Sequence, residues 1–405
     1  MWHWIRHWHD WAMNEIVIPH RLQSQSRSLY FSCEKAGIVF QNQPILPTAD
    51  AVLVEALLRL PPSARKKSDF TLRLPGVDAI PAESFRKEED GERFRVFFRF
   101  APPPASCSAE LYWRTHLLGK LDLPVQTVGD FTNELRVNLP TVFVNVGGQQ
   151  IAASSVVANQ CRGLTATALL RSASGLAPLI DAGLRAVFSW SRSAGEISVP
   201  VPLVASQLNA REALVSASPP KVPRRTGEWQ VTWMMGETVL AAQRLRAITP
   251  KAFHDSLRLL DTRFVVESEK AGLRVHRHLP PWPEVLRAAP CFVLGSREPG
   301  IAGMATVLLI TSGQNDLASE KVETLVTDGP AMICGRFHSA AELQQIETFE
   351  LRCRGRLLGG LPLSPVPLAT INGEGGFRPQ SEFLWNSSAE DELLERMSKL
   401  METGR

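Results

Sequence analysis

Apolar and polar residues alternate with a period of two in the most strongly patterned parts of this chain. In residues 93–100, the apolar side is formed by Phe94, Val96, Phe98 and Phe100, and three arginines, Arg93, Arg95 and Arg99, lie on the other side. Successive side chains of a strand point to opposite faces, so this alternation predicts an antiparallel strand with one buried face. Residues 229–233 and 348–354 show the same pattern and predict two further strands of this kind.

Two short sequence segments recur at long intervals. Residues 117–124 return as 357–363, with a weaker copy at 234–239, and residues 34–38 return as 269–273. Each copy of the second segment precedes a copy of the first by a similar distance. Self-similarity over so long a period predicts tandem domains that share one strand pattern.

The three copies of the longer segment share a glycine, at Gly119, Gly236 and Gly359. Each glycine lies between residues with strand character. Tight hairpin turns need a backbone with positive φ, which glycine adopts without a steric penalty. We therefore expect each domain to close with a hairpin whose turn contains one of these glycines.

Short apolar runs between these segments predict more strands. The runs are separated by clusters of Pro, Gly, Ser and Asp, and the chain contains 29 prolines. Proline is tolerated at strand edges and in turns but is costly inside helices. The pattern therefore predicts an all-β fold of three tandem antiparallel β-sandwich domains, immunoglobulin-like in size and patterning. Their expected ranges are 28–130, 131–250 and 251–376, after an N-terminal tail of residues 1–27.

The C-terminal residues 387–404 have a helical periodicity. Ser387 stands three residues before Glu390, which is the spacing of a capping box. The residues that then form one apolar face are Leu393, Leu394, Met397, Leu400 and Met401. This pattern predicts an amphipathic α-helix that either packs on the third sandwich or docks into a groove of a partner, including a second copy of the chain. The five apolar residues are the candidate partner-binding residues.

The first dozen residues are rich in tryptophan and histidine. On a helix, three of the tryptophans would share one face, and His3 and His7 would share another. Such a helix is compatible with a membrane interface, or with a metal ion held by the two histidines. A disordered tail and a start site further along the chain, at Met13, are simpler interpretations. We prefer the second, because the composition changes just past Met13.

Composition narrows the class of protein. The chain has 405 residues and a net charge of +3, with 44% hydrophobic and 21% charged residues, which is typical of a soluble globular protein. So weak a positive balance does not indicate a nucleic acid or membrane partner, because these need a concentrated basic face. Phe94, Phe98 and Phe100 also face away from the arginines, so they do not form a stacking platform for bases.

The six cysteines do not recur at matching places in the three repeats. A disulfide built into a repeated fold would repeat with it, so we expect free and mostly buried thiols, as in proteins of a reducing compartment. No apolar run reaches the length needed to cross a bilayer, and the N-terminus lacks the uninterrupted apolar stretch of a secretory signal. These features predict a cytoplasmic protein.

Familiar catalytic motifs are absent from the sequence. It has no Walker-type loop, no Gly-x-Ser-x-Gly elbow, no His-Glu-x-x-His and no Cys-x-x-Cys, and no cofactor is predicted. His276 and His278 are the candidate metal ligands, because alternate residues of a strand point to the same face. A metal site needs a third ligand, and solvent-facing histidines are the simpler interpretation.

These features favour a non-enzymatic interaction or scaffolding protein, as a subunit or adaptor of a larger assembly. Sandwiches in a row offer a long surface, and the C-terminal helix offers a separate contact. A protein partner is therefore expected, with self-association through the helix as another outcome. The alternative is a metal- or small-ligand-binding protein or an enzyme, with its site in one divergent repeat. Fold alone does not decide between these functions.

Overall fold

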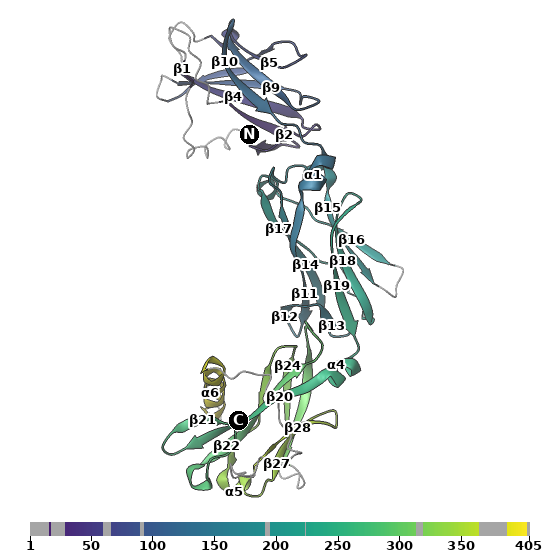
Figure 1. The fold of residues 1–405 in the computed structure, drawn as a ribbon, viewed down its shortest axis with the longest axis vertical. Helices are drawn as coiled ribbons and strands as arrows, with labels where there is room; N and C mark the ends of the chain where they lie inside the picture. Colours follow the sequence, from purple (N-terminus) through teal and green to yellow (C-terminus); the bar gives the residue numbers. More distant parts are fainter. Residues whose placement is uncertain are drawn as a thin grey trace, which may run out of the picture.

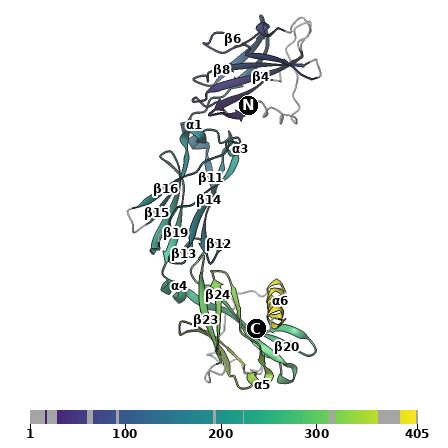
Figure 2. The same cartoon turned by 180° about the vertical axis from the view of Figure 1, so that it is seen from behind.

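The structure is a computed structural model of the chain. It describes residues 16–17, 29–59, 66–89, 93–190, 195–222, 224–312, 319–363 and 387–402. These residues form three consecutive two-sheet units, which lie end to end in an elongated row (Figure 1 and, from behind, Figure 2). The predicted all-β, immunoglobulin-like fold with a C-terminal helix is confirmed.

The first unit packs two sheets of antiparallel strands. The strands are β2 (Leu29–Lys35), β3 (Ile38–Gln41), β4 (Ala51–Arg59), β5 (Phe70–Arg73), β6 (Ile80–Pro81), β7 (Ser84–Lys87), β8 (Arg93–Phe100), β9 (Cys107–Trp113) and β10 (His116–Leu123). Their order is β3–β2–β4–β8–β7 in one sheet and β10–β9–β5–β6 in the other. The short strand β1 (Ile16–Val17) pairs in parallel with β4.

The second unit repeats this arrangement. Its strands are β11 (Arg136–Val146), β12 (Gln149–Ala152), β13 (Ser155–Val157), β14 (Gly163–Arg171), β15 (Leu184–Trp190), β16 (Glu196–Pro200), β17 (Glu212–Ala217), β18 (Gly227–Met235) and β19 (Thr238–Ile248). The sheets read β12–β11–β14–β17 and β13–β19–β18–β15–β16, with β13 parallel to β19. Two one-turn helices, α2 (Leu179–Ala182) and α3 (Ala205–Leu208), lie in its loops.

The third unit has the same two sheets. Its strands are β20 (Leu257–Ser268), β21 (Gly272–His276), β22 (Arg287–Ser296), β23 (Met304–Ser312), β24 (Ser319–Val326), β25 (Ala331–Cys334), β26 (His338–Ser339), β27 (Thr348–Cys353) and β28 (Arg356–Pro362). The sheets read β21–β20–β22–β25 and β24–β23–β27–β28. The helices are α5 (Ala340–Leu343), within the unit, and α6 (Ser387–Glu402), the predicted C-terminal helix.

All three units share a common strand order, to which β1, β7, β13 and β26 are additional strands of single units. In each, the first long strand pairs with its short hairpin partner on one side and with the next long strand on the other. The facing sheet always carries the closing hairpin, as β9–β10, β18–β19 and β27–β28. These sheets correspond to the A–B–E and C–F–G strand groups of the immunoglobulin fold. A shared order of this kind is what the predicted tandem repeat requires.

Short helices connect the units. α1 (Val128–Glu134) lies between the first and second, and α4 (Pro250–Ser256) lies between the second and third. The domain ranges 28–130, 131–250 and 251–376 stay predictions, and their inner boundaries fall at these two helices. Most of the predicted tail, residues 1–27, and the end of the third range lie outside the described residues.

The cores are built from the predicted alternation. On β8, Phe94, Val96 and Phe98 are buried, while the arginines on the opposite face of the strand are more exposed. β18 buries Trp229 and Trp233 in the same way. Because each of these large side chains removes a wide apolar area from water, the alternating strands supply much of the driving force for folding.

The three closing hairpins share one register. Each has a two-residue turn, and the returning strand then leaves one residue out of the pairing as a β-bulge. The bulged residues are Leu118, Leu240 and Leu358. The residues that pair just beyond each bulge on the opposite strand are the buried Leu111, Trp233 and Leu351. The repeat therefore preserves a bulge and the core residue opposite it.

The predicted turn role is right for one glycine and wrong for two. Gly236 has a φ of +54° and lies in the turn between β18 and β19. Gly119 and Gly359 lie in the returning strands instead, paired with Leu111 and Leu351. Arginines with positive φ take the turn in these hairpins, at Arg114 (+54°) and Arg354 (+50°). Leu240 is the bulged residue of the middle hairpin, as Leu118 and Leu358 are in the other two. The middle copy of the longer repeated segment is therefore residues 239–242 and not 234–239.

The shorter repeated segment marks a different hairpin. Residues 34–38 and 269–273 form the turns between β2 and β3 and between β20 and β21. Positive φ is found at Gly37 (+76°) and Gly272 (+64°), and at Gly147 (+59°) in the matching turn of the second unit. Each unit thus opens and closes with a hairpin.

Candidate functional site

The two connections between units are built on the same local sequence. A threonine is followed by a phenylalanine four positions later and by a Leu-Arg pair another four positions on. The residues that fill this pattern are Thr127, Phe131, Leu135 and Arg136, and again Thr249, Phe253, Leu257 and Arg258. The recurrence is present in the sequence, but the intervening positions differ, so it does not stand out as a repeated segment before the helices are seen.

Each threonine caps a helix, and each phenylalanine is buried where two units meet. The Asp130 amide donates to Thr127 Oγ1 (3.2 Å), and the Ala252 amide donates to Thr249 Oγ1 (3.0 Å). These bonds satisfy amides that have no partner within the helix and fix where α1 and α4 begin. Phe131 and Phe253 have no exposed surface. Each helix is therefore a short connection between two units that one buried phenylalanine holds in place.

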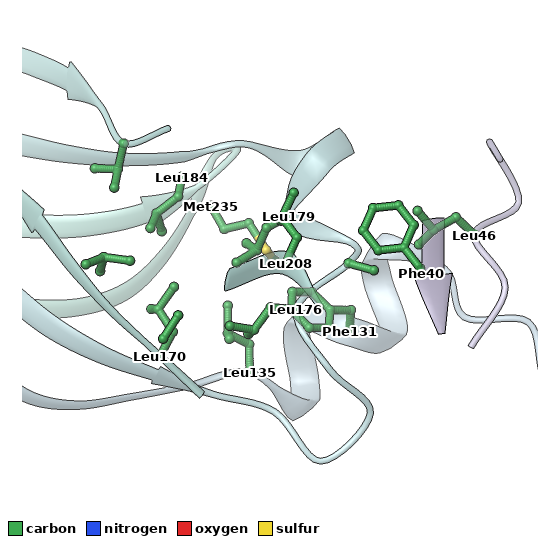
Figure 3. Close-up of a cluster of buried hydrophobic side chains, with 14 of the residues drawn as sticks. Phe40, Leu46, Phe131, Leu135, Leu170, Leu176, Leu179, Leu184, Leu208 and Met235 are labelled. Atoms are coloured by element: carbon green, nitrogen blue, oxygen red, sulfur yellow. The ribbon is translucent and has the colours of Figure 1, made fainter. Parts of the chain in front are cut away.

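At the first junction, the loop after β3 lies against the loop after β14 and against α3. Figure 3 shows Phe40 and Leu46 of the first unit next to Phe131, with Leu176 and Leu208 further into the second unit. All five are at most 3% exposed. The first two units consequently share one continuous cluster of buried apolar side chains.

Gln43 provides the polar part of this junction. Its side chain is 4% exposed, and it bridges two backbone groups of the second unit. Nε2 donates to the Leu208 carbonyl (3.0 Å), and Oε1 accepts from the Ala177 amide (3.0 Å). Hydrogen bonds that are shielded from water fix both the distance and the direction between the groups they join, so Gln43 sets the relative orientation of the two units.

Further polar contacts join the first unit to the second. Lys35 Nζ donates to Thr48 Oγ1 (2.6 Å) and pairs with Asp181, which also accepts from the Thr48 hydroxyl. Asn209 Nδ2 donates to the Val39 carbonyl (3.0 Å). The Lys35 and Asp181 side chains are 18% and 20% exposed. Ion pairs that solvent still reaches add little stability on their own, so these contacts limit the sliding of one unit along the other more than they add to the free energy of the junction.

Glu134, the last residue of α1, holds this helix against the second unit through hydrogen bonds. It accepts from the Ser174 amide (2.5 Å), from the hydroxyls of Ser174 (2.7 Å) and Ser172 (2.9 Å), and from Gln126 Nε2 (2.8 Å). Desolvation raises the pKa of the Glu134 carboxyl, but these hydrogen bonds to its charged form outweigh that effect and lower the pKa to about 2. The carboxylate therefore stays ionised at any physiological pH.

The second junction uses backbone hydrogen bonds. The amides of Ser154 (2.9 Å) and Ser155 (3.0 Å) both donate to the Gly300 carbonyl, and the Ala302 amide donates back to the Ser155 carbonyl (2.9 Å). Ser155 also forms an isolated parallel bridge with Ile301. The loop after β12 thus pairs with the loop after β22 as a strand would, which holds the units at a fixed spacing.

Glu298 reinforces this junction from the third unit. It accepts from Arg246 Nη1 (2.9 Å) on β19 and from the Ser155 hydroxyl (3.3 Å). The Arg246 side chain is 68% exposed, while that of Glu298 is 15% exposed. The ion pair is therefore screened by solvent on the arginine side, and the backbone bonds carry more of the junction.

Corresponding loops meet at both junctions. The loop after the hairpin strand of one unit, which carries Gln43 or Ser154, contacts the loop after the second long strand of the next unit. That second loop carries the sequence glycine, aliphatic, alanine in both cases, as Gly175-Leu176-Ala177 and as Gly300-Ile301-Ala302. The shared construction indicates that the junctions, like the units, are repeated.

The predicted partner-binding helix packs against the chain itself. α6 lies beside β21 on the outer face of the third unit (Figure 1 and Figure 2). Leu393 and Met397 are buried in a cluster with Val265 of β20 and Ala289 of β22, and Leu394 packs at its margin. Of the two alternatives left open by the sequence, the described structure has the intramolecular one. Partner binding by the same face stays a prediction, and it requires α6 to leave this position.

Polar contacts hold α6 at two places. Arg287 Nη2 donates to Met401 Sδ (2.9 Å), and Arg287 also pairs with Glu267. Arg396 Nη1 donates to the Met332 carbonyl (3.2 Å). The side chain of Leu400, the remaining predicted residue, lies outside the described residues.

The sequence of β22 carries a signal for this packing. Residues 288–294 form an unbroken apolar run, whereas the corresponding strand β14 alternates. A strand without alternation is buried on both faces. In β22, Phe292 faces the sandwich core and Cys291 faces α6. The run therefore predicts that another structural element packs on the outer face of the third sandwich.

The described residues place no third metal ligand beside the two candidates, His276 and His278. His276 pairs with Phe264 at the end of β21, and His278 is exposed beyond it. Burial, with Arg274 nearby, lowers the pKa of His276. Within the described ranges, no group of three or more His, Cys, Asp or Glu side chains is placed to hold a metal ion. Metal binding by this pair stays a prediction.

Two further expectations concern the membrane and the cysteines. In the described part of the chain, no helix is long and apolar enough to span a bilayer. The six cysteines are free thiols, and all but Cys107 are buried.

The chain is an all-β protein of immunoglobulin-like sandwich units. No protein-family model and no curated protein matches it. Among solved structures it is similar to FdeC, an Escherichia coli adhesin, at 12% identity over 80% of this chain and 93% of that one, with a TM-score of 0.24. For domains 6–7 of the surface layer protein SbsC, the identity is 11% over 54% of this chain and 97% of that one, with a TM-score of 0.23.

A third similarity is to a pullulanase type I from Bacillus subtilis. The identity is 8% over 55% of this chain, and the TM-score is 0.16. The match spans only 25% of the pullulanase. At such identities and TM-scores, none of the three proteins informs the activity or the partners of this chain.

Proposed function

We propose that this chain is a non-enzymatic interaction or scaffolding protein that works as a stiff three-unit rod within a larger assembly. The observation that carries the proposal is the construction of the two junctions. Interfaces between domains of one chain are by default small and mobile. Here both are anchored by a buried phenylalanine, and both are crossed by hydrogen bonds to backbone groups.

Stiffness matters for a scaffold because it sets the distance between binding surfaces. A flexible linker lets two sites sample many separations, whereas a rigid connection holds them at one and raises the effective concentration of correctly placed partners. The repeated loop contacts at Gln43 and Ser154 would transmit one orientation from the first unit to the third.

The outward-facing sheets and edges of the units are the surfaces we assign to partners. The apolar face of α6 is occupied by the third unit, with Leu393 and Met397 at most 1% exposed. Exposing two such side chains to water costs about 1.5–3 kcal/mol each. Binding through other surfaces avoids this cost, and α6 then contributes to the stability of the third unit.

Small-angle X-ray scattering of the purified chain tests the stiffness. The expected result is a scattering curve that one elongated particle fits. A variant that disturbs the first junction, Gly175→Ala, should need an ensemble of bent shapes, while the hairpin variant Gly148→Ala should scatter like the unchanged chain. If only a flexible ensemble fits the scattering of the unchanged chain, the chain is not a stiff rod and the proposal is wrong.

Affinity capture tests the scaffolding role with the same proteins. The unchanged chain and Gly148→Ala should retain the same partners at equal yield, and Gly175→Ala should lose those that contact more than one unit. If every captured partner binds the three proteins equally, the geometry of the rod has no part in assembly. A catalytic activity in the purified chain would support the alternative function instead.

A further inference from the structure

Two cysteine thiols meet beneath α6. Cys291 of β22 has no exposed surface, and Cys334 of β25 is 9% exposed. Their sulfur atoms are 3.5 Å apart. Leu393 and Met397 of α6 belong to the same buried cluster, so the helix forms a cover over the thiols.

The strand register makes this pair suited to a disulfide. Cys291 and Cys334 are directly opposite on antiparallel strands. The Gly335 amide donates to the Pro290 carbonyl (2.9 Å), which makes Pro290 and Gly335 the hydrogen-bonded pair and their neighbours the non-hydrogen-bonded pair. In such a pair the Cα atoms are closest, at about 4.5 Å. This separation lies within the range that disulfides span, so a bond needs little movement of the backbone.

The surroundings of the pair distinguish the two sulfurs. The hydrogen bond that joins the two thiols, together with the nearby Arg396 guanidinium, lowers the pKa of Cys334. The same hydrogen bond and burial raise the pKa of Cys291. The thiolate is the reactive form of cysteine. Cys334, which is also the more exposed of the two, is therefore the one that reacts first.

The remaining cysteines provide a comparison within the molecule. Burial raises the pKa values of Cys33, Cys161 and Cys353, and these three lie in the sandwich cores. Cys107 is half-buried, and burial raises its pKa as well. These environments disfavour the thiolate and hence oxidation.

We propose that Cys291 and Cys334 are a peroxide-sensitive modification site, which closes to a cross-strand disulfide, and that α6 controls access to it. The Cys334 thiolate attacks one oxygen of hydrogen peroxide, which forms a sulfenic acid and releases hydroxide. The Cys291 sulfur then attacks the Cys334 sulfur, and the sulfenic oxygen leaves as water with the Cys291 proton. In sum, two thiols and one peroxide give one disulfide and two waters.

Access follows from the packing of the helix. Peroxide reaches the sulfurs when Leu393 and Met397 move away, so the rate of oxidation reports how often α6 is displaced. A partner that captures α6 would speed the reaction, and disulfide formation would in turn change the surface on which α6 packs. The site would thereby link the redox state of the surroundings to the position of the helix.

Peroxide treatment of the full chain, followed by thiol alkylation and mass spectrometry, tests the chemistry. The expected product has lost two hydrogen atoms and two alkylatable thiols, and it yields a cross-linked peptide pair that contains Cys291 and Cys334. Cys334→Ser should prevent this product, and Cys107→Ser should not. If Cys107 is oxidised while the pair stays reduced, or if Cys334 reaches the sulfinic acid with Cys291 still free, the proposal is overturned.

The role of the helix needs a second comparison. Leu393→Ala should speed disulfide formation by about tenfold, because it removes most of one buried side chain from the contact that holds α6 in place. Glu395→Ala changes an exposed residue of the same helix and should leave the rate unchanged. Equal rates in all three proteins would overturn control by α6. Reduction with dithiothreitol, which should restore both thiols, separates the disulfide from irreversible oxidation and from misfolding of a variant.

Discussion

Gly175 and Gly300 hold the same position in consecutive units, and each lies directly against a polar side chain of the preceding unit. A Cβ atom at Gly175 would overlap the side chain of Gln43, and a Cβ atom at Gly300 would overlap that of Ser154. Both glycines also have positive φ, at +103° and +60°. The approach of the units to one another thus depends on the absence of a side chain at these two positions.

Gly175→Ala is expected to loosen the first junction. The variant adds backbone strain and a steric overlap with buried Gln43, so the free energy of unfolding should fall by about 2–4 kcal/mol. Urea denaturation followed by tryptophan fluorescence measures this loss. The matched variant is Gly148→Ala, at a position with a φ of +84° and nothing within 4 Å of an added Cβ atom. It should lose only about 1–2 kcal/mol. Equal losses would mean that strain, and not the close approach, accounts for the effect.

Gln43→Ala is expected to uncouple the first two units. The change leaves the Ala177 amide and the Leu208 carbonyl without their partners in a buried place, at a cost of about 1–3 kcal/mol for each unsatisfied group. Denaturation should separate into two transitions, because the first unit can then unfold without the second. Differential scanning calorimetry detects the split. A single transition with an unchanged midpoint would show that the apolar contacts alone join the units.

The pattern of the sequence predicts the strands well and their connections poorly. Phe94 and Trp229 fall on the correct faces because alternation is a local property. The contacts of Gln43 with residues more than a hundred positions away depend on how two finished units meet, which no local pattern contains. Likewise, helical periodicity identifies the apolar face of α6, but its burial follows only from the double-sided packing of β22.

Lowering the pH is expected to weaken the first junction through Glu134. Its carboxyl has a folded-state pKa of about 2, below the ordinary value of 4.5. A lowered pKa means that the group stabilises the fold above its unfolded pKa and loses this effect as the pH falls through the folded value. The loss should therefore begin near pH 4.5 and continue as the pH falls through about 2, since it is complete only below both pKa values.

The pH dependence of Glu134→Gln checks this assignment. The difference in free energy of unfolding between the variant and the unchanged chain should be largest above about pH 5 and should shrink towards about pH 2. The carboxyl is partly open to solvent, so the size of the difference is reduced by screening. Glu323→Gln, at an exposed position on β24, is the control. A difference that stays constant as the pH falls from neutral through this range would contradict the assigned pKa.

Gly236 and Gly359, which the sequence predicts to hold the same turn position, are expected to respond differently to asparagine. Gly236 lies in a turn with a φ of +54°, and a Cβ atom added there would have nothing within 4 Å. Asparagine tolerates this backbone region, so Gly236→Asn should change the free energy of unfolding by less than about 1 kcal/mol. Gly359 lies in a strand, where a Cβ atom would overlap the side chain of Leu259.

Gly359→Asn should therefore displace Leu259 and destabilise the third unit by about 1–3 kcal/mol. Thermal unfolding of the two variants measures both effects. A larger loss for Gly236→Asn than for Gly359→Asn would contradict the placement of Gly359 in the returning strand, because only a strand position brings its Cα against the Leu259 side chain.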